Sequence, residues 1–215
     1  MNDAVQQRPG EGFVEPQVRD EFPGLRLHWI TRDARRGPSP PSLQHQLHEL
    51  SSRYRGAGVV ALRTKPIPHA YRTFFRQIGL DPDVDRIPSE EVAVARLMHG
   101  GLRSVGLIED ACLVALVETG VPVWALDADA VDPGGLGIRT AADDDRVAPD
   151  QIVLEPGTLV VADATTIHAL LFAEPLRGHG IGSRTRRVAL FAVAVDGVPA
   201  IHVEEALWIC AELLG

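Results

Sequence analysis

The sequence lacks the features that define several classes of protein. Its 215 residues contain two cysteines, Cys112 and Cys210, both inside apolar segments. This excludes a disulfide framework and predicts buried, reduced thiols. The longest apolar run, residues 111–117, is well short of the ~20 residues that a membrane-spanning helix needs. The first residues also lack the apolar stretch of a secretory signal. We therefore expect a cytoplasmic protein without a membrane partner.

Motifs for metal binding and for covalent catalysis are also missing. The eight histidines form no H-E-x-x-H or Cys/His pattern with the spacing of zinc ligands. The acidic runs at 127–132 and 143–145 do not continue into a calcium-binding loop, and no G-x-S-x-G motif is present. The sequence therefore predicts no metal and no other cofactor. It also offers no candidate for a covalent nucleophile.

Lysine is nearly absent, since Lys65 is the only one among the 21 basic residues. The net charge of −8 is unevenly distributed. Residues 1–103 carry 15 basic and 12 acidic side chains, residues 104–176 carry 2 and 13, and residues 177–215 carry 4 and 4. A polyanionic partner would therefore have to avoid the acidic middle of the chain.

Two stretches are candidates for binding phosphate. GHGIGSRTRR at 178–187 is Gly-rich and basic, and its backbone N–H groups together with Arg184 and Arg186 could bind phosphate. It lacks the ending of a Walker motif, and a plain hairpin loop is the alternative. The second is the start of the helix expected from residue 90, where Ser89 should be the N-cap and Arg86 adds a charge. Three neighbouring aspartates favour a structural role there.

The order of expected elements indicates an α+β fold. Residues 1–20 are polar and aperiodic, so we expect a disordered tail followed by one domain over 21–215. Most helices are expected before residue 120 and most strands after it, which predicts a mixed, largely antiparallel sheet flanked by helices. The expected helices are 43–54, 69–79, one from 90, 106–120 and 199–215. The expected strands are 25–30, 58–62, 121–129, 135–141, 151–155, 157–163, 167–173 and 186–195.

Four stretches in order resemble the editing domain of the phenylalanyl-tRNA synthetase β subunit, the B3/B4 domain. They are FFRQIGLDPDVDRIPSEE, EDACLVALVETGVPVWALD, GLGIRTA and EPGTLVVAD. The resemblance runs over roughly residues 22–214 and implies a B3/B4-like fold. The catalytic core and the anticodon-binding domain of a synthetase do not fit into this length, so we expect no aminoacylation by this chain.

The resemblance also implies an activity and a pocket. In this family the domain removes wrongly attached tyrosine from tRNA by hydrolysing its ester to the terminal ribose. Such a pocket needs a positioned water, donors for the developing oxyanion and a cavity for the amino acid. The implied substrate-binding residues are Leu113, Trp124, Asp127, Gly137 and Arg139. The structural alternatives are a core position for Trp124, a bulge at Gly137 and an Asp127–Arg139 pair joining two strands.

The sequence departs from the family at this pocket. Where the family has a Thr-Asn pair on the buried helix, this chain has Cys112 and Leu113, and where it has a histidine, this chain has Trp124. The acid that contacts the tyrosine hydroxyl corresponds to Asp150 or Gln151. The pocket thus loses groups that hydrogen-bond a polar substrate, and no catalytic residue can be assigned.

Three functions remain open at this stage. The first is a free-standing editing factor that binds the acceptor end of a mischarged aminoacyl-tRNA and hydrolyses its ester. The second is a non-catalytic module that binds tRNA or an amino-acid-like small molecule. The third is a hydrolase of a free small molecule, which the net charge of −8 tolerates better than tRNA.

Overall fold

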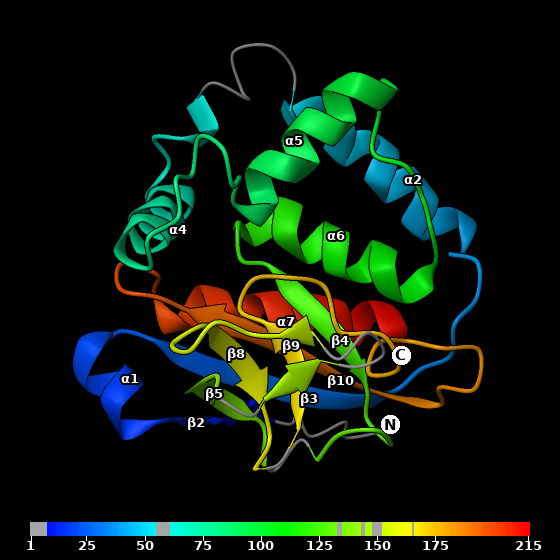
Figure 1. The fold of residues 1–215 in the computed structure, drawn as a ribbon. Helices are drawn as coiled ribbons and strands as arrows, with labels where there is room; N and C mark the ends of the chain where they lie inside the picture. The colour runs from blue at the N-terminus through cyan, green and yellow to red at the C-terminus, as the bar shows by residue number, and fades with distance from the viewer. Residues whose placement is uncertain (1–7, 55–60, 133–134, 143–144, 148–151, 165) are drawn as a thin grey trace.

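The computed structural model describes residues 8–54, 61–132, 135–142, 145–147, 152–164 and 166–215. Helices and largely antiparallel sheets pack together, which confirms the prediction of an α+β fold (Figure 1). None of the helices that these residues form combines the length and apolar character required to cross a bilayer.

The central layer is a four-stranded sheet in the order β1-β3-β10-β4. Its long strands, β3 (Arg26–Asp33) and β10 (Arg187–Ala194), pair antiparallel along their whole length. Strand β4 (Val123–Asp127) pairs antiparallel with the other edge of β10, and β1 (Gly10–Glu11) pairs with β3. Every residue of β10 after the first is buried. Its continuous apolar run is typical of a strand that is covered on both faces.

Helices α6 (Leu107–Thr119) and α7 (Ala200–Leu214) pack on each other and cover one face of this sheet (Figure 1). Helix α2 (Pro41–Leu50) packs on the outer side of α6 and is followed by the 3-10 helix η1 (Ser51–Tyr54). Helix α6 ends at Gly120, whose φ of +80° lies in the left-handed region that glycine adopts without strain, as the sequence predicts. Because α6 is apolar on nearly every face, it can pack against several neighbouring elements at once.

Helices α4 (Pro66–Gln77) and α5 (Pro88–His99) are joined by a turn that carries Asp81, Asp83 and Asp85. Arg72 of α4 is 5% exposed, and its Nη1 donates to both carboxylate oxygens of Glu90 on α5 at 2.9 and 2.8 Å. Its Nη2 donates to Asp83 at 2.8 Å, and this bond lowers the pKa of Asp83. The charged residues of this turn therefore connect two helices.

The predicted N-cap of α5 is wrong by two residues. The N-cap is Ile87, and Pro88 occupies the first helical position, where its fixed φ and missing N–H are tolerated. Ser89 consequently lies inside the first turn and is 2% exposed.

The other face of the central sheet packs against a second sheet in the order β2-β5-β8-β9 (Figure 1). Its strands are β2 (Phe13–Val14), β5 (Gly137–Thr140), β8 (Leu159–Ala162) and β9 (Ile167–Leu170). The β2–β5 pair is parallel and the other pairs are antiparallel. Strands β6 (Arg146–Val147) and β7 (Ile152–Val153) form a separate antiparallel pair. The strands after residue 120 are thus divided between sheets, where the sequence suggests one.

The prediction of a disordered tail over residues 1–20 is wrong for its described part. Strands β1 and β2 lie within it, and helix α1 (Pro16–Glu21) follows. Val14 and Val18 are buried, and the carboxylate of Glu15 accepts hydrogen bonds from the backbone and hydroxyl of Thr140 at 2.9 and 2.8 Å. Pairing with the rest of the protein thus orders a segment that has no pattern of its own.

Two of the predicted segments fall partly outside the described residues. Residues 1–7 of the expected tail are outside. Of the strand expected at 58–62, residues 58–60 are also outside, and Ala61 and Leu62 are helical.

Candidate functional site

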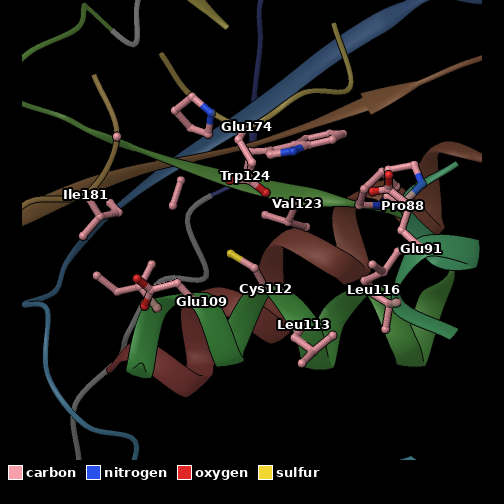
Figure 2. A pocket seen from close by; sticks show the side chains of 16 residues that line it. Pro88, Glu91, Glu109, Cys112, Leu113, Leu116, Val123, Trp124, Glu174 and Ile181 are labelled. Carbon is pink, nitrogen blue, oxygen red and sulfur yellow. The ribbon is translucent and has the colours of Figure 1, made fainter. Parts of the chain in front are cut away.

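A cavity of about 390 Å³ lies between α6 and β4 (Figure 2). Helix α6 lines it with Cys112, Leu113 and Leu116, and β4 lines it with Val123 and Trp124. The side chain of Cys112 points from α6 toward β4 (Figure 2). The volume is in the range of small-ligand sites, and the walls are apolar as such sites usually are.

Three carboxylates border this apolar cavity: Glu91 of α5, Glu109 of α6 and Glu174 of the loop after β9 (Figure 2). Among the described residues, no Arg, Lys or His side chain lines it. Desolvation raises the pKa of Glu174, and the carboxylate of Glu109 raises it further. Desolvation also raises the pKa of Glu91, against the charge of Arg86. Glu91 and Glu174 are exposed at the rim, where water screens them, so the shifts are small in energy. The cavity therefore favours a ligand with an apolar part and a cationic group.

An aromatic cluster holds Trp124 and the loop that carries Glu174. Trp124 is 7% exposed and stacks on Phe191, with ring centroids 5.5 Å apart and an interplanar angle of 20°. Phe172 lies 5.9 Å from Trp124 and has a φ of +64°, which costs a non-glycine residue about 1–3 kcal/mol. Its ring also contacts Tyr71, Phe74 and Phe75 of α4. These contacts offset the strain and fix the start of the loop.

A second cavity of about 420 Å³ adjoins the first, since both are lined by Pro175, Gly180 and Ile181. Two exposed arginines also line it, Arg184 of the Gly-rich segment and Arg177 directly before that segment. This cavity is therefore more cationic than the first, and its exposed guanidinium groups suit a phosphate.

Asp127 organises the Gly-rich segment. Its Oδ2 accepts a hydrogen bond from Thr185 Oγ1 at 2.6 Å, and that hydroxyl accepts one from the backbone N–H of Gly182 at 2.9 Å. Asp127 thus lines the second cavity and not the first. Arg186 is exposed, and its Nη1 donates to the carbonyl oxygens of Ser183 and Thr185 at 3.2 and 2.9 Å. It does not line either cavity.

Gly137 and Arg139 lie in β5 of the second sheet and line neither cavity. A Cβ at position 137 would overlap the ring and the carbonyl of Phe13, so glycine permits close pairing of β2 with β5. The guanidinium of Arg139 donates to both carboxylate oxygens of Asp145, at 2.5 and 3.2 Å, and this lowers the pKa of Asp145. The Asp127–Arg139 pair considered from the sequence is not formed.

Arg86 and Ser89, the two candidates for phosphate binding at the start of α5, do not form a common site. Arg86 is exposed, whereas Ser89 is buried and its Oγ has no hydrogen-bond partner among the described residues. Arg86 and Ser89 therefore present no common surface to a phosphate. The family's tyrosine-contacting acid corresponds to Asp150 or Gln151, which lie outside the described residues.

A hydrogen-bonded chain of titratable groups connects β9 to the Gly-rich segment. His168 is fully buried; its Nε2 lies 3.0 Å from Asp163 Oδ2 and its Nδ1 lies 3.0 Å from Nδ1 of His179. Burial lowers the pKa of His168, which favours the neutral ring. Because a carboxylate only accepts hydrogen bonds, the tautomer that satisfies both ring nitrogens donates from Nε2–H to Asp163 and accepts at Nδ1 from His179. The carbonyl of His179 accepts a bond from the backbone of Asp127 at 2.9 Å. The spacing of these residues in the sequence gives no indication of this series of hydrogen bonds.

The geometry defines an α+β protein with a cavity of small-ligand size at the junction of a buried helix and the central sheet. The described residues contain no group of three or more His, Cys, Asp or Glu placed to hold a metal ion. The family model of the B3/4 domain matches residues 70–204, so the chain belongs to the B3/4 domain family. The matched range contains both cavities, and it confirms the resemblance seen in the sequence.

Two similar proteins are phenylalanine–tRNA ligase β subunits. The one from Tropheryma whipplei (strain Twist) is 30% identical over 139 residues, which cover 63% of this chain and 14% of that protein. The one from Gloeobacter violaceus is 31% identical over 124 residues, which cover 53% of this chain and 16% of that protein. The chain thus matches only a small part of the length of these relatives.

Proposed function

We propose that this protein binds the aminoacylated 3′ end of a tRNA and hydrolyses the ester that joins a wrongly attached amino acid to the terminal ribose. The observation that carries this proposal is the adjacency of two cavities of different character. One is apolar with carboxylates at its rim, and the other is lined by glycines and arginines. An aminoacylated tRNA end has the same two parts side by side, an amino acid with an ammonium group and a ribose-phosphate chain. The relatives named above are subunits of a tRNA ligase, which supports this choice.

The ester would lie where the cavities meet, beside Pro175, Gly180 and Ile181. A water molecule attacks the carbonyl carbon, the bond to the ribose oxygen breaks, and that oxygen takes up a proton. Glu174 directly precedes this junction, and its raised pKa suits a carboxylate that accepts the proton of the attacking water. An aminoacyl ester is already reactive, so one base and a fixed orientation suffice.

The arginines of the second cavity would hold the tRNA. Arg177 and Arg184 are exposed and can donate paired hydrogen bonds to phosphate. The protein as a whole carries a charge of −8. We therefore expect contact with the acceptor end alone and a modest dependence on salt, with a slope set by two or three phosphates.

One observation favours a second candidate, binding without hydrolysis. In the described part of the chain, no hydroxyl, amide or imidazole side chain lines the first cavity. If Glu174 is not a base, the site can hold an amino acid and the tRNA end without cleaving the bond between them. Measuring binding and turnover on the same substrates separates the two.

The test is to incubate the protein with tRNAs charged with each labelled amino acid and to follow release of the label. At least one should be deacylated well above the rate in buffer. Glu174→Gln should lower that rate about 100-fold, the low end for loss of a general base. Arg184→Ala should weaken tRNA binding, whereas Arg19→Ala, an exposed site on α1 outside both cavities, should not. If no charged tRNA is deacylated faster than in buffer, hydrolysis is refuted. Salt-dependent binding would then support the second candidate. Equal cleavage of simple amino acid esters would instead favour a small-molecule hydrolase.

A further inference from the structure

Glu109 has unused capacity to bind a cation at the cavity wall. It lies in the first turn of α6, where the positive end of the helix dipole favours an ionised carboxylate. Its Oε2 is buried, packs against Gly106 and accepts no hydrogen bond from the described residues. Its Oε1 forms a loose ion pair with the exposed Arg36, whose Nε lies 3.8 Å away, which is too long for a hydrogen bond. The packing of Oε2 orients the carboxylate. Oε1 can still accept a hydrogen bond from a donor that lies closer than Arg36.

Glu109 lies near the end of the cavity where the ester is proposed to lie. It is close enough to Glu174 to raise the pKa of that carboxyl, and in Figure 2 it lies toward Ile181, one of the residues that both cavities share. The α-carbon of an aminoacyl ester is bonded directly to the ester carbonyl. An α-ammonium group attached to that carbon would therefore lie within reach of Glu109.

The walls in the middle of the cavity, between Glu109 at one end and Glu91 at the other, are apolar (Figure 2). An amino acid side chain that runs from the junction into the cavity passes between Cys112 and Leu116 of α6 and Val123 and Trp124 of β4. A hydroxyl group placed there would leave its water partners. These four side chains offer it the weak thiol of Cys112 and the indole N–H of Trp124, but no strong acceptor. An aliphatic side chain loses nothing by the same transfer and gains from the burial of its surface.

We infer that the first cavity selects amino acid esters that have a free α-ammonium group and an aliphatic side chain, with Glu109 as the residue that recognises the ammonium. This inference rests on the proposed function and defines its substrate class. N-formyl-, N-acetyl- and peptidyl-tRNAs lack the charge and are rejected. Tyrosyl and threonyl esters are disfavoured, because the Cys112, Leu116, Val123 and Trp124 side chains offer their hydroxyl groups no strong acceptor.

The experiment uses analogues in which an amide replaces the ester, so that binding is measured without cleavage. The probe is adenosine 5′-monophosphate with isoleucine joined to a 3′-amino group. Its N-acetyl derivative, its threonyl counterpart and adenosine 5′-monophosphate itself are the comparisons. By titration calorimetry at pH 7, the isoleucyl probe should bind at least tenfold more tightly than each of the three. Glu109→Gln should remove the preference over the N-acetyl derivative.

Glu118→Gln is the matched control, since Glu118 is an exposed glutamate on the same helix that lies outside the first cavity and pairs with Arg53. It should keep the full preference. Equal binding of the free-amine and N-acetyl probes by the natural protein overturns the inference and leaves the proposed function in place; this comparison needs no variant. A preference that survives in a folded Glu109→Gln protein removes Glu109 from the role. Failure of every nucleotide probe to bind refutes the proposed function and the inference together.

Discussion

Removal of the Arg72 cation should destabilise the protein more than removal of the whole ion pair. Arg72 and Glu90 are each 5% exposed, and the two N–H···O bonds between them are 2.9 and 2.8 Å long. Arg72→Met leaves the Glu90 carboxylate buried without this partner, which typically costs about 3–5 kcal/mol. Arg63 lies 3.6 Å from Glu90 but is half exposed, so it can compensate only in part. We therefore expect the low end, about 3 kcal/mol, which at this chain length lowers the melting temperature by roughly 10 °C.

Urea unfolding followed by circular dichroism measures this cost. Arg72→Met should shift the midpoint strongly, and the double variant Arg72→Met/Glu90→Leu should recover much of the loss, because it leaves no buried charge. Arg76→Met, an exposed site on the same helix, should stay within about 0.5 kcal/mol of the natural protein. Equal midpoints for Arg72→Met and Arg76→Met would show that the pair does not hold α4 on α5. A double variant no more stable than Arg72→Met would attribute the cost to packing.

Three further predictions test the packing, the cavity and the buried histidine. Gly137→Ala should lower the free energy of unfolding by about 1–3 kcal/mol because its Cβ meets the neighbouring strand, whereas Gly37→Ala, with open space around it, should be nearly neutral; similar urea midpoints would contradict this. Cys112→Leu should fill part of the cavity and weaken binding of the isoleucyl probe at least tenfold at a similar melting temperature; unchanged affinity would place the ligand elsewhere. The lowered pKa of His168 means that the unfolded chain binds the proton first, so its stabilising contribution is complete above about pH 6.5 and declines as pH falls toward the folded-state pKa. His168→Gln should show a smaller loss of stability between pH 7 and 5 than the natural protein, and equal losses would refute the assignment.

Elements with a strong local pattern could be predicted from the sequence. Helix α6 is a long apolar segment closed by Gly120, and β10 is an apolar run of strand length. The correct start of α5 can also be predicted from the sequence, because Pro88 is a stronger marker of a first helical position than Ser89 is of an N-cap. Strands β1 and β2 are two residues long each, and their order comes from pairing with distant strands. The division of strands between two sheets likewise depends on pairing, which local periodicity does not encode.

The cavity could be predicted only in part. The resemblance predicts a pocket at α6 and β4, and Leu113 and Trp124 line the first cavity. Motif order does not indicate to which sheet a strand belongs. The resemblance therefore groups Gly137 and Arg139 with residues of the first cavity, from which the structure separates them. Glu109 has the pattern of an acid that complements a helix dipole. Glu174, the neighbouring carboxylate, lies in a loop whose position depends on the strained Phe172. No sequence pattern reports that strain.

The distribution of charge along the chain is compatible with the proposed binding of a tRNA end by an acidic protein. The acidic segment 104–176 contains Glu109 and Glu174 of the first cavity, and the arginines of the second cavity begin at 177. Apart from Asp127, which lines the second cavity, the boundary in the sequence is therefore also a boundary in space, and the ester is proposed to lie on it. Electrostatic attraction to the tRNA is then local, because charges beyond a Debye length of about 8 Å are largely screened at physiological salt. The same arrangement repels a phosphate from the amino acid cavity and an ammonium from the arginines, so charge favours one direction of binding for the proposed tRNA end.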